Sequence, residues 1–200
     1  MLELEKKLLL TQEEYAYLLN EAPKISAVKQ TNYYFDTADY LMDKCGITCR
    51  IREKDGKYIA TIKEHRETGI SVERSEQALD EWDTHFFDGL GVSLLGMLTT
   101  WRTTLLKDAR CEIVLDKNNY LGVEDYELEV EYAPGEEAYA DALLSSIMHK
   151  LSAFFHPLIP LSARGGVGKS KSRRFLTHLK ELKRKEKNHE NDFGKDCKPA

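Results

Sequence analysis

Two short segments of alternating acidic residues constrain the fold of this chain more than any other feature. Near the N-terminus, alternate positions carry Glu3, Glu5 and Lys7 with leucines on the opposite parity, and residues 125–132 read Asp-Tyr-Glu-Leu-Glu-Val-Glu-Tyr. Because successive side chains of a β-strand point to opposite faces, each segment predicts a strand with one charged and one apolar face. Carboxylates two residues apart on a strand lie roughly 7 Å from each other and repel. We therefore expect a cation among them, and hard oxygen ligands of this kind suit Mg²⁺, Mn²⁺ or Ca²⁺.

Two other segments carry the opposite charge. Arg50 and Arg52 share one face of a predicted strand, and Lys63 lies on the polar face of the next one. A single strand of this kind is most simply an ordinary sheet strand, with one face on a core and one in water. Here the signs are segregated, since two strands carry acids and two carry bases. A sheet surface that gathers acids for a metal and bases for anions indicates a metal–phosphate site.

The bulk composition argues against several classes of protein. The chain has 200 residues, of which 42% are hydrophobic and 32% charged, and this predicts one globular domain. No apolar run approaches the length of about 18 residues that a membrane span needs. The first residues enter a strand pattern directly, without the features of a signal peptide. We therefore expect a cytoplasmic protein without a membrane partner.

Charge is unevenly distributed along the chain. Residues 171–200 hold ten Lys/Arg and five Asp/Glu, whereas the first 170 residues hold 19 Lys/Arg and 29 Asp/Glu. An acidic body with a basic tail is not the electrostatic footprint of a nucleic-acid binder, so we expect no nucleic-acid partner. The four cysteines match no zinc-binding spacing and are expected to be reduced thiols: Cys45, Cys49, Cys111 and Cys197.

Periodicity and turn signals predict eight short strands and four helices. The strands are expected at residues 2–9, 29–36, 46–54, 57–64, 69–77, 101–107, 110–117 and 123–132. The helices are expected at residues 12–20, 79–99, 136–154 and 170–185. Thr11 and Glu14 match a capping box for the first helix, and Asp55-Gly56 is a strong hairpin signal. This pattern predicts an α+β fold with a closed or nearly closed antiparallel sheet and the helices mostly outside it.

In this order the motifs resemble the CYTH family, also called the triphosphate tunnel metalloenzymes. The family's Glu-x-Glu-x-Lys strand is matched by residues 3–7, its Arg-x-Arg strand by residues 50–52 and its Thr-x-Lys strand by residues 61–63. Further segments match the family at Tyr34-Phe35-Asp36, Leu115-Asp116, Asp125 to Glu131 and Lys171 to Phe175. The chain most resembles the uncharacterised CYTH proteins of Gram-positive bacteria.

The resemblance implies a fold and a domain division. The expected fold is an eight-stranded antiparallel β-barrel, the triphosphate tunnel, with helices packed outside, over residues 1–178. Residues 179–200 would be a basic helix end and a tail that we expect to be disordered.

The resemblance also implies an activity. Members of the family bind triphosphate compounds with Mg²⁺ or Mn²⁺ and hydrolyse tripolyphosphate, thiamine triphosphate or RNA 5′-triphosphates; one branch catalyses adenylate cyclisation. We expect metal-dependent hydrolysis of a triphosphate-containing small molecule or polyphosphate. An adenylate cyclase and a non-catalytic sensor of polyphosphate or nucleotide are the alternatives.

The residues that the resemblance assigns fall into three overlapping sets. The implied metal ligands are Glu3, Glu5, Asp116, Glu127, Glu129 and Glu131. The implied substrate contacts are Lys7, Arg50, Arg52, Lys63, Arg102, Arg110 and Lys171. The implied catalytic residues are Glu3, Glu5, Lys7, Glu73 and Glu76.

Two of these assignments have alternatives. The family has a glutamate on the strand after Lys63, and here Glu73 and Glu76 have opposite parity, so we expect only one to point inward and favour Glu73. The basic residue expected near position 102 is either Arg102 or Lys107. We favour Arg102, with Arg110 on the next strand as a second contact.

One further motif suggests phosphate binding but has the wrong context. Residues 163–170 read Ala-Arg-Gly-Gly-Val-Gly-Lys-Ser, which resembles a phosphate-binding P-loop. The P-loop pattern needs Gly where Ala163 stands and a buried strand before it. The preceding segment contains Pro157 and Pro160, and proline cannot donate to a sheet ladder. We therefore expect a linker into the last helix.

Overall fold

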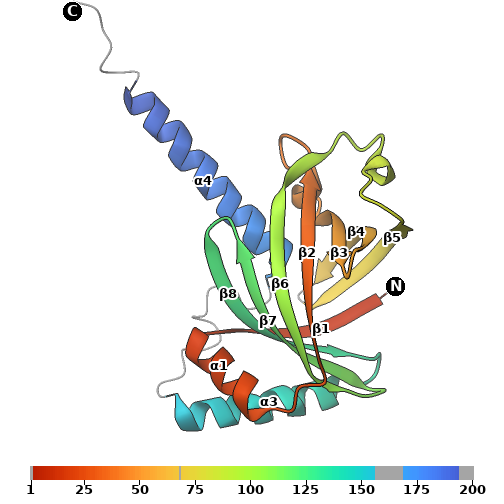
Figure 1. Cartoon of the computed structure of the whole chain (residues 1–200), viewed down its shortest axis with the longest axis vertical. Helices are drawn as coiled ribbons and strands as arrows, with labels where there is room; N and C mark the ends of the chain where they lie inside the picture. The colour runs from red at the N-terminus through yellow and green to blue at the C-terminus, as the bar shows by residue number, and fades with distance from the viewer. Residues whose placement is uncertain (1, 68, 156–168, 194–200) are drawn as a thin grey trace, which may run out of the picture.

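The structure, a computed structural model, describes residues 2–67, 69–155 and 169–193. This part of the chain contains eight strands, all paired antiparallel, which close into a barrel in the order β1-β5-β4-β3-β2-β6-β7-β8 (Figure 1). The predicted eight-stranded antiparallel barrel with external helices is confirmed. The strands are β1 (Leu2–Leu10), β2 (Ser26–Asp36), β3 (Ile47–Lys54), β4 (Lys57–Glu67), β5 (Ile70–Leu79), β6 (Ser93–Lys107), β7 (Cys111–Tyr120) and β8 (Val123–Tyr132). The helical elements are α1 (Gln12–Glu21), α2 (Leu41–Lys44), η1 (His85–Phe87), α3 (Glu137–Phe154) and α4 (Lys171–Phe193).

The first helix begins where its capping box predicts. The Thr11 hydroxyl accepts a hydrogen bond from the Glu14 backbone N–H at 3.2 Å, and the Glu14 carboxylate accepts one from the Thr11 backbone N–H at 2.9 Å. Two otherwise unpaired backbone donors are satisfied in this way. The predicted hairpin is also present, since Asp55 and Gly56 both have positive φ, at 53° and 72°, and connect β3 to β4.

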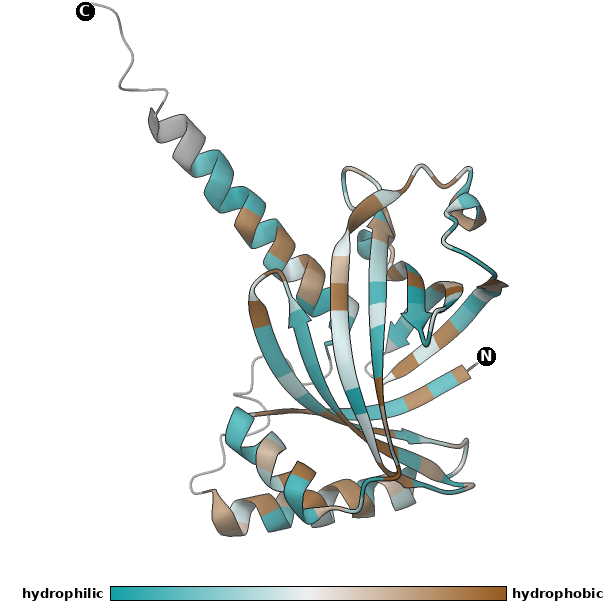
Figure 2. Ribbon diagram, in the orientation of Figure 1, coloured by the Kyte–Doolittle hydropathy of each residue, from teal (hydrophilic) through white to brown (hydrophobic). Residues whose placement is uncertain are grey.

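Helices α1 and α3 cover the outside of the barrel over β1, β7 and β8. Apolar side chains on the outer faces of these strands, such as Leu8 and Leu128, pack against Leu18 of α1 and Leu151 of α3. The two helices touch each other through Tyr17, whose ring lies 4.8 Å from that of Phe154 between centroids. Because the apolar parity of these strands is used outside, their charged parity faces into the barrel. Figure 2 shows the corresponding apolar bands on α1 and α3.

The predicted helix at residues 79–99 is wrong. The chain there contains only the short η1, and β6 begins at Ser93 and runs through to Lys107. Gly89 and Gly91 take positive φ values of 82° and 65°, which an α-helix does not allow. The apolar residues that suggested a helical face instead pack on the outside of β2–β4, with the Phe87 ring 4.9 Å from that of Phe35.

The last helix, α4, is longer than predicted and docks at one end of the barrel. Phe175 is completely buried and packs with Leu176 and Leu179 against Tyr34 and other residues of a second apolar cluster. Gly96 permits this contact, because a Cβ at that position would lie 3.0 Å from Phe175. Beyond this contact the helix extends away from the barrel, and its outer part is mostly hydrophilic (Figures 1 and 2).

Two smaller expectations can be compared with the described residues. None of the helices there is both long and apolar enough to cross a membrane. Cys45, Cys49 and Cys111 are free thiols, as predicted, while Cys197 lies outside the described residues.

Candidate active site in the barrel

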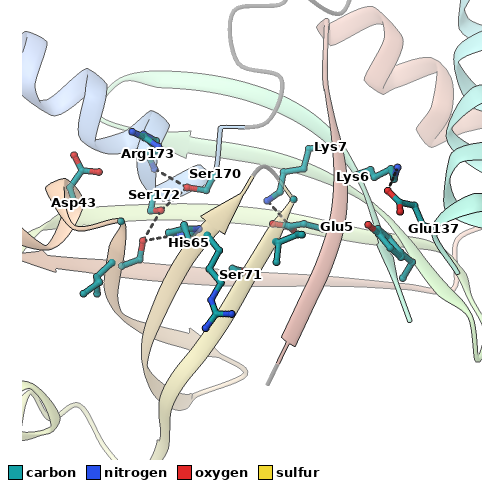
Figure 3. Close-up of a pocket in the computed structure, with 17 residues that line it drawn as sticks. Glu5, Lys6, Lys7, Asp43, His65, Ser71, Glu137, Ser170, Ser172 and Arg173 are labelled. Atoms are coloured by element: carbon teal, nitrogen blue, oxygen red, sulfur yellow. Dashed lines mark hydrogen bonds and ion pairs between the residues drawn. The ribbon is translucent and has the colours of Figure 1, made fainter. Parts of the chain in front are cut away.

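Three hollows that share lining residues lie along the barrel, and together we call them the tunnel. The central hollow is narrow, about 140 Å³, and we call it the waist. One wider opening of about 550 Å³ shares Glu5 and Lys7 with the waist, and Figure 3 shows it beside the start of α4. The other opening, of about 570 Å³, shares Arg52 and Arg102 with it. The waist therefore adjoins a wider hollow on each side.

One side of the waist is acidic. Strand register brings the carboxylates together, since Glu5 pairs with Glu131 across β1–β8 and Asp116 pairs with Glu127 across β7–β8. We call this set the acidic wall: Glu3, Glu5, Glu129 and Glu131, which line the waist, and Asp116 and Glu127, which are buried and do not line it.

Two groups of three carboxylates within the acidic wall have oxygens less than 4.8 Å apart. The open triad is Glu5, Glu129 and Glu131, all of which line the waist. The deep triad is Asp116, Glu127 and Glu129, and all three of its members are buried. Clustered carboxylate oxygens at this spacing are the donors that hard divalent cations prefer, so the residues present fit Mg²⁺ or Mn²⁺.

The opposite side of the waist is basic. We call Arg50 and Arg52 of β3 and Lys63 of β4 the basic wall. Arg52 donates to Asn32 at 3.1 Å and has no ion-pair partner within the described residues. Arg50 lies 3.7 Å from the carboxylate of Glu73, a long contact for an ion pair.

The basic wall carries excess positive charge, as its pKa shifts show. Burial lowers the pKa of Arg52 to about 10, and the charges of Arg50 and Arg102 act in the same direction. Burial and the charge of Arg50 also lower the pKa of Lys63, although Lys63 donates to Glu3. These cations are therefore held in a site that lacks enough negative charge to balance them.

The acidic wall, by contrast, is neutralised from within the protein. Lys7 lies 3.0 Å from Glu5 and 2.7 Å from Glu129. Arg102 of β6 contacts Asp116 at 2.7 Å, Glu131 at 3.2 Å, and Glu129.

Two further cations reach the acidic wall from α4. Lys171 contacts all three members of the deep triad, and Arg174 contacts Glu127 and Asp125, each at 2.9 Å. The two side chains lie three residues apart and therefore share one face of the helix.

The pKa values of the carboxylates report this neutralisation. Burial alone would raise the pKa of Glu127, but the charges of Lys171 and Arg174 outweigh it and lower that pKa to about 2. The pKa of Glu3 is likewise lowered to about 2, because Lys63 outweighs the effect of burial. Glu131 differs, since burial raises its pKa despite the nearby Arg102. Negative charge is therefore less compensated at Glu131 than at Glu127 or Glu3.

The strand after Lys63 departs from the expected parity. A register shift between Ile62 and Lys63 makes Glu73 the partner of Lys63 and Glu76 the partner of Thr61. Residues directly opposite each other on antiparallel strands share a face, so both glutamates lie on the face of Lys63. The bulge adds a residue between them, so the opposite parity read from the sequence does not hold, and parity alone does not choose between the two. Glu76 is exposed, however, and neither glutamate lines the waist.

Ten of the residues assigned by resemblance line the waist, whereas Asp116, Glu127, Glu73, Glu76 and Arg110 do not. Arg110 lies in the turn between β6 and β7, stacked 3.4 Å over the centre of the Tyr139 ring and away from the waist. Lys107, the alternative to Arg102, is exposed and pairs with Glu112. Arg102 is thus the basic residue of β6 that reaches the acidic wall.

Several polar residues of the waist had no clear sequence signal. His65, Thr48 and Ser172 line it and form a hydrogen-bonded chain, with 2.9 Å from His65 Nε2 to Thr48 Oγ1 and 3.0 Å from there to Ser172 Oγ (Figure 3). Burial, followed by the charges of Lys63, Lys7 and Arg50, lowers the pKa of His65 to about 4. The one sequence signal for His65 is its position two residues after Lys63 on β4, which puts both side chains on the same face of the strand.

The P-loop-like segment is only partly described. Residues 163–168 lie outside the described residues. Lys169 is exposed, and its backbone carbonyl accepts a hydrogen bond from Arg174 at 3.0 Å. Ser170 lines the waist, and its hydroxyl lies 2.9 Å from that of Ser172.

Comparison with known proteins agrees with this architecture. A family model described as the CYTH domain matches residues 1–151. The chain is 30% identical, over 154 residues, to the Bacillus subtilis protein named "Putative triphosphatase YjbK", covering 68% of this chain and 80% of that protein. A crystal structure from Bacillus halodurans, named a "putative adenylate cyclase", has a TM-score of 0.61 at 26% identity and covers 78% of this chain and 93% of its own. A Hippeastrum protein is described as a "putative adenylyl cyclase" with a dominant triphosphatase activity. Its structure has a TM-score of 0.60 at 21% identity, and the match covers 74% of this chain and 87% of that one. At this identity the likeness supports the fold alone.

Proposed function

The chain belongs to the CYTH domain family, and from that premise we propose that it hydrolyses a linear triphosphate inside its barrel with the help of a divalent metal ion. The observation that carries the proposal is the waist, a hollow of about 140 Å³ with an acidic wall on one side and a basic wall on the other. This space is smaller than the roughly 300 Å³ of the smallest ordinary small-molecule pockets, which favours a slender phosphate chain. We propose inorganic tripolyphosphate, or the triphosphate part of a compound like thiamine triphosphate, as the substrate.

In this proposal the acidic wall holds the metal ion. Glu5, Glu129 and Glu131 would bind Mg²⁺ or Mn²⁺, with Glu3 beside them on β1. A bound divalent ion would stabilise negative charge on the phosphate oxygens and activate a water molecule. A carboxylate oxygen of the open triad would orient that water for attack in line with the leaving phosphate.

The basic wall binds the substrate in this proposal. Arg50 and Arg52 can each donate two parallel hydrogen bonds to a phosphate, while Lys63 and Lys7 supply point charges. Arg102, which lies between the two walls, would contact the same phosphates from β6. Such catalysis works by positioning and charge stabilisation, so no Ser or Cys nucleophile is needed.

The glutamates of β5 have a supporting role in this proposal. The contact from Glu73 to Arg50 would orient the guanidinium group toward the waist. Glu76, which is exposed, would act only if the substrate extended beyond the waist.

The test is release of inorganic phosphate from tripolyphosphate, thiamine triphosphate, ATP and pyrophosphate, each with Mg²⁺, Mn²⁺ or EDTA. We expect metal-dependent release from a triphosphate and weak release from pyrophosphate. Absence of release from every compound, in a protein that still binds triphosphate by calorimetry, would contradict the proposal.

The neighbour named as an adenylate cyclase supplies the second candidate, because it is 26% identical to this chain. The products formed from ATP distinguish the two. Cyclic AMP with pyrophosphate would indicate a cyclase, whereas ADP with phosphate would indicate a triphosphatase.

A further inference from the structure

The two carboxylate triads share Glu129 but differ in what fills them. The Lys171 ammonium contacts every member of the deep triad, at 2.8 Å from Asp116, at 2.8 Å from Glu129, and at close range from Glu127. No described cation contacts all three members of the open triad in this way. Lys7 contacts Glu5 and Glu129 there, and Arg102 contacts the other pair, Glu129 and Glu131.

We propose that Lys171 permanently occupies the deep triad, so that this protein binds a single divalent ion, in the open triad. The inference rests on the proposed metal-dependent function and adds the number of metal ions and the group that replaces a second one. An ammonium group has three N–H donors, and the deep triad offers one oxygen from each of three carboxylates. Lys171 thus satisfies the oxygens that a second ion would need.

The deep triad is closed to the tunnel. Asp116 and Glu127 have no exposed surface, and neither lines any of the three hollows of the tunnel. Their remaining oxygens are also engaged, since Arg102 contacts Asp116 and Arg174 contacts Glu127. A hydrated ion would have to lose its water and displace these groups to enter.

Lys171 is held in place by the helix that carries it. Three residues further along α4, Arg174 contacts Asp125 and Glu127, and the next residue, Phe175, is fully buried against the barrel. Further along α4, Lys180 forms an ion pair with Asp43 at 2.7 Å. Withdrawing Lys171 would break all of these interactions together, so its ammonium behaves as a fixed part of the site.

The open triad is also contacted by cations, Lys7 and Arg102, but it differs from the deep triad in its access to the waist. Its three members line the waist, and the side chain of Glu131 is one-third exposed, at 33%. An ion arriving with the substrate therefore has to displace contacts of Lys7 and Arg102 but does not have to unfold any packed element.

The experiment is a count of bound Mn²⁺ on the full-length protein without substrate, by titration with electron paramagnetic resonance detection. For the natural chain we expect one Mn²⁺ per protein, with the spectrum of an isolated ion. Two Mn²⁺ with magnetic coupling between them would overturn the inference and leave the proposed function intact. No bound Mn²⁺ would overturn both.

A substitution tests whether Lys171 is the group that excludes the second ion. Lys171→Met removes the charge and keeps a similar length, and we expect the count to rise from one to two, with coupling between the ions. Adding Asp116→Asn should return the count to one. Lys169→Met, the same change two residues earlier on an exposed side chain, should leave it at one.

Circular dichroism establishes that each variant is folded before its ions are counted. A folded Lys171→Met variant that still binds one ion would overturn the inference. If that variant does not fold, the count on the natural chain decides the question by itself.

Discussion

The two walls of the tunnel use the same kinds of cation in opposite ways. Lys171, at the acidic wall, has a pKa raised by Asp116, Glu127 and Glu129 despite its burial. Lys63, at the basic wall, has a pKa that burial and the charge of Arg50 lower. The acidic wall is therefore balanced by the protein's own side chains, whereas the basic wall is left with positive charge that an anionic ligand can balance.

This difference separates the deep triad, whose charges are balanced by buried cations of the protein, from the basic wall, whose charges an anionic ligand can balance. A buried charge whose partner is missing costs stability, so the basic wall is maintained at the expense of the free energy of unfolding. The acidic wall, with its partners in place, adds no such cost. Stability and ligand binding should therefore respond differently to substitutions on the two walls.

The largest effect is expected from a paired stability measurement. Lys171→Met removes the cation from three buried carboxylates and should lower the free energy of unfolding by about 3–5 kcal/mol. Arg52→Met removes a buried cation that has no carboxylate partner within the described residues, and should leave the free energy of unfolding unchanged or raise it. Urea unfolding of both variants at pH 7 measures the contrast.

The effect of an added ligand should distinguish the Arg52→Met variant from the natural chain. Tripolyphosphate should raise the melting temperature of the natural chain and should do so less for Arg52→Met, since a bidentate phosphate contact is lost. Equal destabilisation by the two substitutions would mean that the walls are not different in the way we describe.

The next largest effect concerns activity. Glu5→Gln removes a carboxylate charge from the open triad and should lower metal-dependent turnover by at least about 100-fold, given that losses of supporting groups around metals already cost 10–100-fold. The fold should be retained, because Glu5 is at the tunnel surface and only Lys7 pairs with it among the described residues. Phosphate release and circular dichroism measure the two effects.

Glu64→Gln is a matched control for this change. Glu64 lies on the same barrel but on the outer parity of β4, where it contacts Arg66 and Arg74. Its substitution should leave turnover unchanged. Undiminished turnover in Glu5→Gln would remove Glu5 from the metal site.

A smaller effect is expected on the pH dependence of stability, because the pKa of His65 is lowered in the folded protein. Burial and the charges of Lys63, Lys7 and Arg50 lower the pKa of His65 to about 4 from an unfolded value of 6.5. Between these values the unfolded chain binds more protons than the folded one, so this residue makes stability fall as pH falls. The loss between pH 6.5 and 4.5 should be about 1–2 kcal/mol.

Comparing the natural chain with His65→Gln isolates the contribution of His65 to the pH dependence of stability. Unfolding in urea at pH 6.5, 5.5 and 4.5 should show a shallower loss of stability in the variant. Carboxylates with lowered pKa values, such as Glu3, lose their stabilising effect mainly below pH 4.5 and contribute equally to both proteins. Parallel pH profiles would mean that burial and the neighbouring cations do not lower the pKa of His65.

Much of the barrel could be predicted from sequence, because strand periodicity is a local property. The alternation in residues 3–7 and 125–132, the Asp55-Gly56 turn and the Thr11 capping box each depend on a few neighbouring residues. The same alternation predicted which charged side chains share the tunnel face. Residue type and parity were sufficient there.

The misassigned features depend on contacts between distant segments. The apolar spacing in residues 79–99 suits a helix, but those side chains pack on the outside of β2–β4 after glycines interrupt the chain. The bulge that places Glu73 and Glu76 on one face arises from pairing with β4. Similarly, no residue near Lys171 in the sequence indicates that its partners lie on β7 and β8, 42 to 55 residues earlier.

The smallest effect is expected at Lys169, and it tests whether the basic wall is the phosphate site at all. Lys169 is exposed, does not line the waist, and uses only its backbone carbonyl to contact Arg174. Lys169→Ala keeps that carbonyl, so stability should change by less than about 0.5 kcal/mol and turnover should be unaffected. Calorimetry with tripolyphosphate and urea unfolding measure both. If the folded variant lost phosphate binding, residues 163–170 would act as a phosphate loop, and the phosphate site would have to be moved from the basic wall to the start of α4.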